Sequence, residues 1–142
     1  MRLHVLLIAG ICTCASAQET QKLDIGHAEI SGVLKNGSRV QPGDDVPTVP
    51  GKTYAGLRPE RRLDVSAITS GMDSSPLAGA IKLGYLDNIQ LIMDARQTAE
   101  YKRLYGKHVV VDCNIDYIGR YYTPVFCGVV SIVLKPSETS SK

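Results

Sequence analysis

The chain has 142 residues and a formal net charge of +2 at pH 7, and it contains one Phe and no Trp. This length suits one domain with its own core but not two. The near-neutral charge and the scarcity of aromatic rings argue against a nucleic-acid partner, because single-strand binders need a basic groove with stacking aromatics. We therefore expect a single small domain that binds no nucleic acid.

Residues 1–17 are typical of a secretory signal peptide, with a basic start, an apolar run over 5–11 and a small-residue cleavage site. The apolar run is shorter than the roughly 20 residues of a membrane span. Cleavage after Ala17 predicts a periplasmic or secreted protein that keeps no integral membrane segment. Of the four cysteines, only Cys113 and Cys127 would then remain, and an even pair fits an oxidising compartment.

The segments that follow are expected to form short strands, because they alternate apolar and polar residues or are rich in β-branched residues. The stretch 41–62 is rich in Gly and Pro and is long for a loop, so it is either functional or contains a strand. A polar turn is expected at 70–76. The strands expected before the helix are 27–34, 53–57, 63–69, 77–86 and 89–93.

One helix is expected over 95–105. Asp94 caps its start, Gln97 three residues on makes a variant of the capping box, and Gly106 suits a left-handed stop. The apolar stripe of this helix is narrow, so much of its surface should be exposed. The stripe consists of Thr98, Tyr101, Leu104 and Tyr105.

The segment 106–135 is expected to form a two-stranded hairpin. Every second residue from Val109 to Tyr117 should point inward. The second strand, 125–134, is apolar on both faces and should be the more central one; its odd-numbered members Val125, Cys127, Val129 and Val133 are expected on one face.

A hairpin turn centred on Arg120 would set Cys113 directly opposite Cys127. Directly opposed residues lie within the reach of a disulfide, so the register predicts a Cys113–Cys127 bridge. The alternative is two reduced, buried cysteines. The same register pairs Val111 with Val129 and Ile115 with Val125.

Several short strands, one helix and a closing hairpin follow the order of an oligonucleotide/oligosaccharide-binding (OB) barrel, which has a helix between its third and fourth strands. We therefore predict a mainly β chain whose residues 18–135 form a small OB-like five-stranded barrel, with a disordered tail at 136–142. The alternative is another small β-barrel or sandwich with one helix.

The hairpin combines Tyr105-Gly106-Lys107, Val109 and Val111 with Thr123-Pro124-Val125 and a final apolar strand. This pattern resembles a group of small exported bacterial proteins that contain a domain of unknown function, and the match covers about the last quarter of the chain. In that group histidines precede the threonine, whereas Tyr121-Tyr122 stands there in this chain, so no metal site is implied. The resemblance implies an exported, barrel-like protein and no particular activity.

Ligands of such barrels commonly meet the loop between the first two strands and the loop between the last two, here 35–52 and 118–122. A charge beside amphipathic rings is a composition that contact surfaces favour. The alternative is that the rings cover the barrel end and the arginines are simply solvated. The predicted contact residues are Arg120, Tyr121, Tyr122, Tyr54 and Arg58.

No catalytic residue, metal site or cofactor is predicted. Asp112-x-Asn114-x-Asp116 resembles the opening of a calcium loop, but Tyr117 stands at the required Gly and Thr123 at the bidentate Glu. A solvated strand face is the favoured interpretation. His27 and His108 are the only histidines beyond the predicted signal peptide, and each lies in an expected strand.

Size, export and the lack of a catalytic constellation favour a non-enzymatic binding protein that recognises a protein or cell-envelope ligand. The most concrete version is a periplasmic inhibitor or immunity protein. One alternative is a small envelope hydrolase, which requires His27, His108 and carboxylates to meet in one pocket. Another is an assembly component that pairs through an edge strand.

Overall fold

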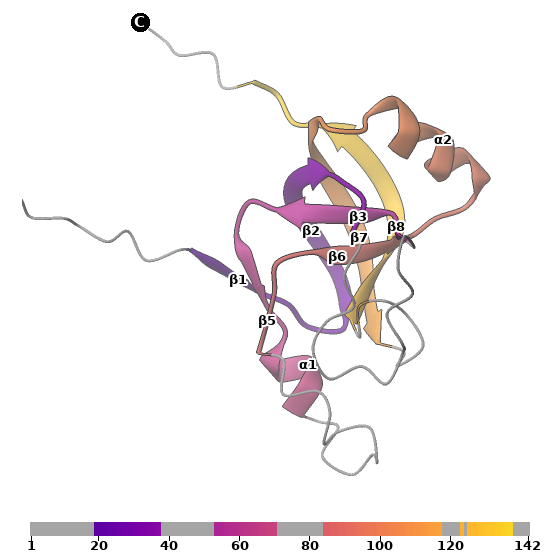
Figure 1. Ribbon diagram of the computed structural model, residues 1–142. Helices are drawn as coiled ribbons and strands as arrows, with labels where there is room; N and C mark the ends of the chain where they lie inside the picture. The colour runs from indigo at the N-terminus through magenta and orange to yellow at the C-terminus, as the bar shows by residue number, and fades with distance from the viewer. Residues whose placement is uncertain (1–18, 38–52, 71–83, 118–122, 124, 138–142) are drawn as a thin grey trace, which may run out of the picture.

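The computed structural model describes residues 19–37, 53–70, 84–117, 123 and 125–137. Five strands close into a barrel in the spatial order β2-β3-β6-β8-β7 (Figure 1). β6 and β8 run parallel, and the other neighbouring pairs are antiparallel. With a helix between the third and fourth strands, the arrangement confirms the predicted OB-like barrel. The bounds are β2 Gly26–Leu34, β3 Gly56–Pro59, β6 Ile89–Ile92, β7 His108–Tyr117 and β8 Val125–Leu134.

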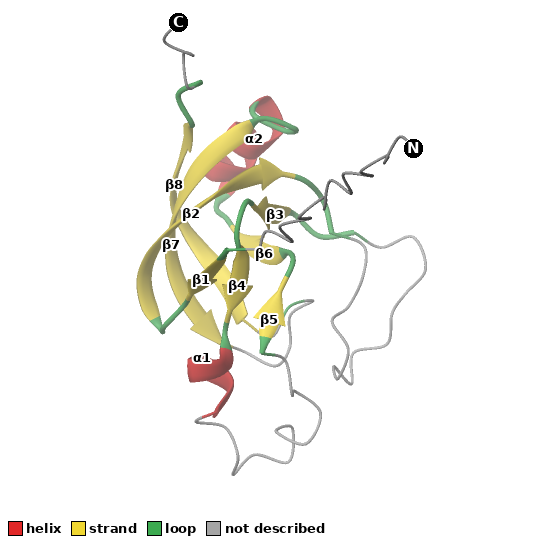
Figure 2. Cartoon of the chain, turned by 90° about the vertical axis from the view of Figure 1, so that its left-hand side faces the viewer, coloured by secondary structure: helices red, strands yellow, loops and turns green. Residues whose placement is uncertain are grey.

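A small second sheet and two helices complete the described fold. β1 (Thr20–Lys22) runs parallel to β4 (Arg62–Asp64), which pairs antiparallel with β5 (Tyr85–Leu86). α1 (Ser66–Ser70) follows β4, and α2 (Ala95–Arg103) joins β6 to β7. Two perpendicular views place α2 and α1 at opposite ends of the barrel (Figures 1 and 2), and these ends are termed the α2 end and the α1 end.

α2 begins as predicted. The Asp94 carboxylate accepts a hydrogen bond from the Gln97 backbone N–H at 2.7 Å, and the Gln97 side-chain oxygen accepts one from the Asp94 N–H at 2.9 Å. Gly106 has the expected left-handed conformation, with φ of 78°, but α2 ends at Arg103, two residues before the predicted end at Tyr105. Tyr101 and Leu104 are buried, so the narrow stripe is what fixes α2 to the barrel.

β7 and β8 form the predicted hairpin, but the predicted register is wrong by two residues between Cys113 and Tyr117 and by three between Val109 and Asp112. The last described pair is Tyr117 with Val125, which centres the hairpin on residue 121 instead of the expected Arg120. A shift of two keeps each side chain on its own face, so the inward residues of β7 are buried as expected. The observed pairs are Cys113 with Val129, Ile115 with Cys127, Tyr117 with Val125 and Val111 with Ile132.

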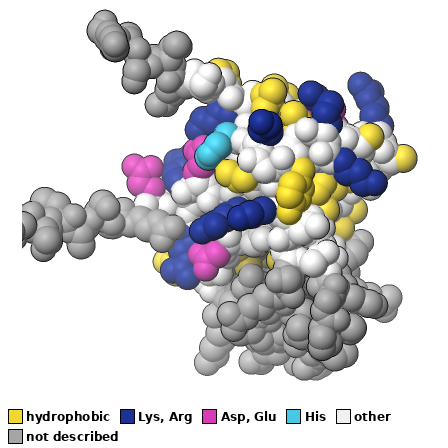
Figure 3. All heavy atoms as spheres, turned by 45° about the horizontal axis from the view of Figure 1, so that its top comes forward, with side chains coloured by type: hydrophobic (Ala, Val, Ile, Leu, Met, Phe, Trp, Pro, Cys, Tyr) yellow, Lys and Arg dark blue, Asp and Glu magenta, His cyan; other side chains and the backbone are white. Residues whose placement is uncertain are grey.

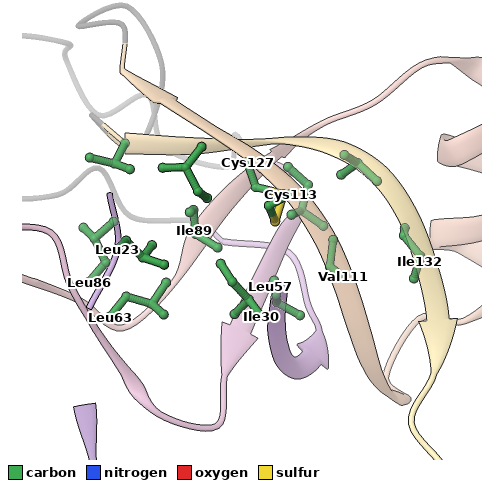
Figure 4. Packing of buried hydrophobic residues seen from close by; sticks show 14 of the residues in the cluster. Leu23, Ile30, Leu57, Leu63, Leu86, Ile89, Val111, Cys113, Cys127 and Ile132 are labelled. Carbon is green, nitrogen blue, oxygen red and sulfur yellow. A yellow bond between two sulfur atoms is a disulfide. The ribbon is translucent and has the colours of Figure 1, made fainter. Parts of the chain in front are cut away.

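Cys113 and Cys127 form the predicted disulfide, although they are diagonal rather than direct neighbours across the ladder. Their Cα atoms are 5.1 Å apart. Both residues are fully buried among the apolar side chains of the barrel (Figure 4). The bridge therefore links two adjacent strands from within the core.

A β-bulge in β8 explains a second difference from the expected hairpin. Asp112 pairs with Ser131 and Cys113 with Val129, so Val130 is an extra residue in the ladder. The extra residue reverses the faces beyond it: Ile132 is 9% exposed, whereas Val133 is 58% exposed. The expectation that Val133 shares the inward face is therefore wrong.

The strand expected over 63–69 ends at Asp64 and gives way to α1. The Asp64 carboxylate accepts hydrogen bonds from the Ser66 N–H at 3.0 Å and from the Ser66 hydroxyl at 2.6 Å. Such side-chain bonds to a nearby backbone N–H compete with strand formation. The lost strand is thus explained by one local carboxylate.

Two other boundaries differ from the expected ones. The strand expected at 53–57 is β3, which begins at Gly56, and the strand expected at 77–86 is observed only as β5. Residues 77–83 lie outside the described residues, as do 71–76 of the expected turn. The strand expected at 89–93 is confirmed as β6.

Candidate functional site

The two loops predicted to form the site start at opposite ends of the barrel. Val33, near the start of one loop, lies opposite His108 on β7, whereas the other loop follows Tyr117 at the far end of β7. His108 and Tyr117 are nine residues apart along β7, so the starts of the two loops are separated by about 30 Å. Arg120, Tyr121 and Tyr122 lie outside the described residues, so their role stays a prediction.

Tyr54 is buried rather than presented at the surface, with 6% of its area exposed. Its backbone forms a bridge with Gly37, and burial raises the pKa of its hydroxyl. A Cβ on Gly37 would lie 2.1 Å from the Tyr54 ring. Tyr54 therefore holds the two ends of the β2–β3 connection together. Two of the predicted contact residues, Tyr54 and Arg58, lie in the described part of the chain, and of these Arg58 alone is exposed.

Arg58 belongs to a group of basic side chains at the α2 end, where two grooves of about 240 and 540 Å³ share Glu60 and His108. On this face Lys and Arg side chains gather around a histidine that lies beside an acidic side chain (Figure 3). The group is termed the cationic end and consists of Lys35, Arg58, Lys107, His108 and Lys135 with Glu60.

Barrel closure brings these residues together from four separate segments. The N–H of Lys135 donates to the carbonyl of His108 at 3.0 Å, and the N–H of Leu34 donates to the carbonyl of Lys107 at 3.3 Å. The N–H of Glu60 donates to Ser31 O at 2.9 Å. Backbone hydrogen bonds between strands therefore fix the positions of the residues that form the cationic end.

Glu60 is the only acidic residue lining these two grooves among the described residues. Its carboxylate accepts hydrogen bonds from Lys135 Nζ at 2.8 and 3.0 Å, and His108 Nδ1 lies 3.5 Å from it. The Lys135 hydrogen bond is the main cause that lowers the pKa of Glu60. No ion pair with another described residue neutralises Lys35, Arg58 or Lys107, so the surface presents net positive charge.

We expect Lys135→Met to raise the pKa of Glu60 toward the ordinary value, because the substitution removes the hydrogen bond that lowers it. A lowered native pKa contributes stability above the unfolded-state pKa of about 4.3, and this contribution is lost as pH falls through the native value. The cost at pH 7 should stay below about 1 kcal/mol because the pair is partly exposed.

The measurement is an NMR titration of the Glu60 side-chain carboxyl carbon. Lys107→Met is the matched control, because Lys107 lines the same groove without a hydrogen bond to Glu60. An unchanged titration of Glu60 in Lys135→Met would contradict the assigned cause.

Sequence reasoning did not single out Lys35, Glu60, Lys107 or Lys135. One signal was present in the sequence. In a hairpin the start of the first strand and the end of the second lie side by side at the open end, and here this places Lys107 and His108 next to Lys135. Pattern reasoning overlooked it because flanking lysines are usually solvated and carry no periodic signal.

The two histidines do not meet. His27 lies opposite Asn114 and His108 opposite Val33, six residues apart along β7, which is about 20 Å. The pocket required by the hydrolase alternative is therefore not formed by them. Among the described residues no group of three or more His, Cys, Asp or Glu could hold a metal ion.

The calcium-like run lies on the outer side of β7, as a strand face predicts. Asp112 Oδ1 is 2.5 Å from His27 Nε2 on the neighbouring β2. The Asp116 carboxylate accepts a hydrogen bond from the Tyr117 N–H at 2.7 Å. The Asp112 carboxylate thus lies against a residue of β2, and the Asp116 carboxylate bonds to the next residue of β7.

A third groove, of about 500 Å³, runs between α2 and the β2–β3 connection. The Tyr101 hydroxyl donates to Asn36 Oδ1 at 2.8 Å and accepts from the Gly56 N–H at 3.3 Å, and burial is the main cause that raises its pKa. Tyr105 packs edge-on against Tyr101 with ring centroids 5.8 Å apart. These tyrosines fix α2 beside the cationic end.

Comparison of the chain with protein-family models, curated proteins and solved structures finds no match. Neither described helix has the length and apolar character of a membrane span. Functional inference consequently rests on the geometry and charge of the cationic end.

Proposed function

We propose that this chain is a non-enzymatic binding protein whose cationic end recognises an acidic partner protein. The supporting observation is the concentration of charge: four Lys or Arg residues and one His surround a single carboxylate, in a chain whose net charge is only +2. Such a patch steers an acidic surface during encounter and suppresses basic partners. Within this class, an inhibitor or immunity protein is the most concrete version.

Export belongs to the same proposal. Disulfides persist in oxidising compartments, and the buried Cys113–Cys127 bridge supports a periplasmic or secreted protein. The signal-peptide pattern at residues 1–17 supports the same location. A partner would then be another exported protein or an anionic component of the cell envelope.

The test uses poly-L-glutamate as an acidic polypeptide and phosphatidylglycerol vesicles as an anionic envelope surface. Lys107→Glu and Arg58→Glu should each weaken poly-L-glutamate binding about tenfold in 50 mM salt, a difference of about 1.4 kcal/mol. Raising the salt to 500 mM should weaken wild-type binding, because the contacts are exposed to screening. Isothermal titration calorimetry measures each affinity.

Lys22→Glu is the matched control, because Lys22 is exposed on β1 and lines neither groove of the cationic end. Equal losses in Lys22→Glu and Lys107→Glu would show that net charge alone drives binding, and would overturn the proposal. Binding to the vesicles without binding to poly-L-glutamate would assign the surface to the envelope instead of a protein.

A further inference from the structure

The α2-end half of β8 has an edge without a partner strand among the described residues. β7 pairs with β8 along Val125–Leu134, whereas β6 pairs with it only as far as Gly128. Beyond Gly128 the chain of β6 turns away into α2, and Gln97 Nε2 on α2 donates to the carbonyls of Val129 at 2.6 Å and Val130 at 3.4 Å. The remaining edge runs from Ser131 to Leu134.

The direction of the backbone groups on this edge follows from the ladder. Lys135 donates its N–H to His108 on β7, and the groups of an antiparallel strand alternate between its two sides. Ser131 and Val133 therefore bond to β7, while the N–H and C=O groups of Ile132 and Leu134 point away from it. No hydrogen bond from a described residue reaches those outward groups.

The edge opens onto a groove of about 520 Å³ between β8 and α2, within the usual size range of ligand grooves. Val130, which lines the groove, is 57% exposed, and farther along β8 Val133 and Leu134 are 58% and 49% exposed. Unpaired strand edges with apolar side chains are templates for another strand. A closed barrel normally lacks such an edge, so the short pairing of β6 creates it.

We propose that an extended peptide segment with acidic residues at its N-terminal end adds to this edge as a strand antiparallel to β8. The backbone groups of Ile132 and Leu134 supply the hydrogen bonds, as in other strand-addition complexes. The edge leads directly to Lys135, whose groove also contains Lys107 and Leu134, so an antiparallel segment begins at the cationic end. Charge complementarity there selects acidic residues, and in this respect the inference rests on the proposed function.

A single strand fits this edge better than a second copy of the barrel. α2 lies along the groove and contributes Arg96, Gln97 and Glu100 to its wall, together with the N-cap residue Asp94. A sheet continued from another barrel would have to displace α2, whereas one extended segment can lie between α2 and β8. The occupant is therefore a peptide segment of the acidic partner.

The test uses the acetylated and amidated peptide Glu-Glu-Thr-Val-Thr-Val-Thr with the full chain. Leu134→Pro removes one outward N–H and no ladder hydrogen bond, because proline is tolerated where the N–H of an edge strand faces outward. We expect Leu134→Pro to weaken peptide binding at least tenfold. Leu134→Ala keeps the N–H and should weaken binding less than threefold, and far-UV circular dichroism should show both variants folded.

Hydrogen exchange gives a readout that needs no variant. In the free protein the amides of Ile132 and Leu134 should exchange faster than those of Ser131 and Val133, and saturating peptide should slow the first pair at least tenfold. If peptide leaves all four rates unchanged, or if Leu134→Pro binds as wild type does, the inference is overturned.

The outcomes separate the two proposals. Suppose that Lys107→Glu loses poly-L-glutamate binding while Leu134→Pro binds the peptide as wild type does. The proposal of an acidic partner would then stand, and the proposal of strand addition would be rejected. A second peptide, Gln-Gln-Thr-Val-Thr-Val-Thr, tests the role of the acidic residues. If it slows exchange at Ile132 and Leu134 as much as the Glu-Glu peptide does, both the selection of acidic residues and the charge-based function are rejected.

Discussion

Gly32→Ala is expected to destabilise the fold by about 3 kcal/mol, the upper part of the usual range for overpacking. Gly32 pairs with Pro59 on one side and Val109 on the other, so it lies in the part of β2 that is held between β3 and β7. A Cβ there would lie 2.3 Å from the carbonyl oxygen of Arg58 and 2.9 Å from the Pro59 Cα. Both atoms belong to backbone that the barrel ladder holds in place.

Thermal unfolding followed by circular dichroism measures this effect, and a loss of about 3 kcal/mol corresponds to a fall of roughly 10 °C in Tm. Gly84→Ala is the matched control, because no atom of the described residues lies within 4 Å of a Cβ at that position. It should leave Tm nearly unchanged or raise it slightly. A Gly32→Ala protein as stable as Gly84→Ala would show that β3 can move away from β2 at little cost.

Local signals allowed much of this fold to be predicted from the sequence. The alternation along β7 placed every second residue in the core because one face of that strand is buried and the other is wet. Asp94 and Gln97 predicted the start of α2 correctly, because a capping box involves only residues that are close in sequence. The order of elements then sufficed for the OB-like barrel, since the helix falls between the third and fourth strands.

Structural features that depend on residues far apart in the sequence could not be predicted from local patterns. The hairpin register depends on the length of the β7–β8 connection, and a prediction centred on Arg120 missed it by two residues. The bulge at Val130 depends on the pairing of Asp112 and Cys113, so alternation within β8 alone could not reveal it. The site was harder still, because Lys35, Arg58 and Lys135 become neighbours only after the barrel closes.

The bulge also links fold and function. Because Val130 is an extra residue, Ile132 turns inward and Val133 turns outward. Val133 thereby lies exposed on the part of β8 whose edge β6 leaves open, close to Lys135. A regular hairpin would have carried a different set of side chains to the cationic end, so the stability of this hairpin bears directly on the proposed binding surface.

Replacement of both bridge cysteines, Cys113→Ala with Cys127→Ala, is expected to destabilise the protein by about 3 kcal/mol, the chain-entropy value for a loop of about 15 residues. The two residues are 14 apart in the chain. Without the cross-link the unfolded chain gains conformations, and β7 and β8 then depend on their ladder and core contacts alone. Urea unfolding followed by circular dichroism should show a lower midpoint.

The slope of the urea transition should also become steeper in the double variant, because an unfolded chain without the cross-link exposes more surface. A reductant supplies the control: it should bring the wild-type protein to the midpoint of the double variant and leave the double variant unchanged. Equal midpoints for the oxidised wild type and the double variant would mean that packing alone holds the hairpin. In that case neither the covalent bond nor the burial of the two sulfur atoms would add measurably to the stability of this core.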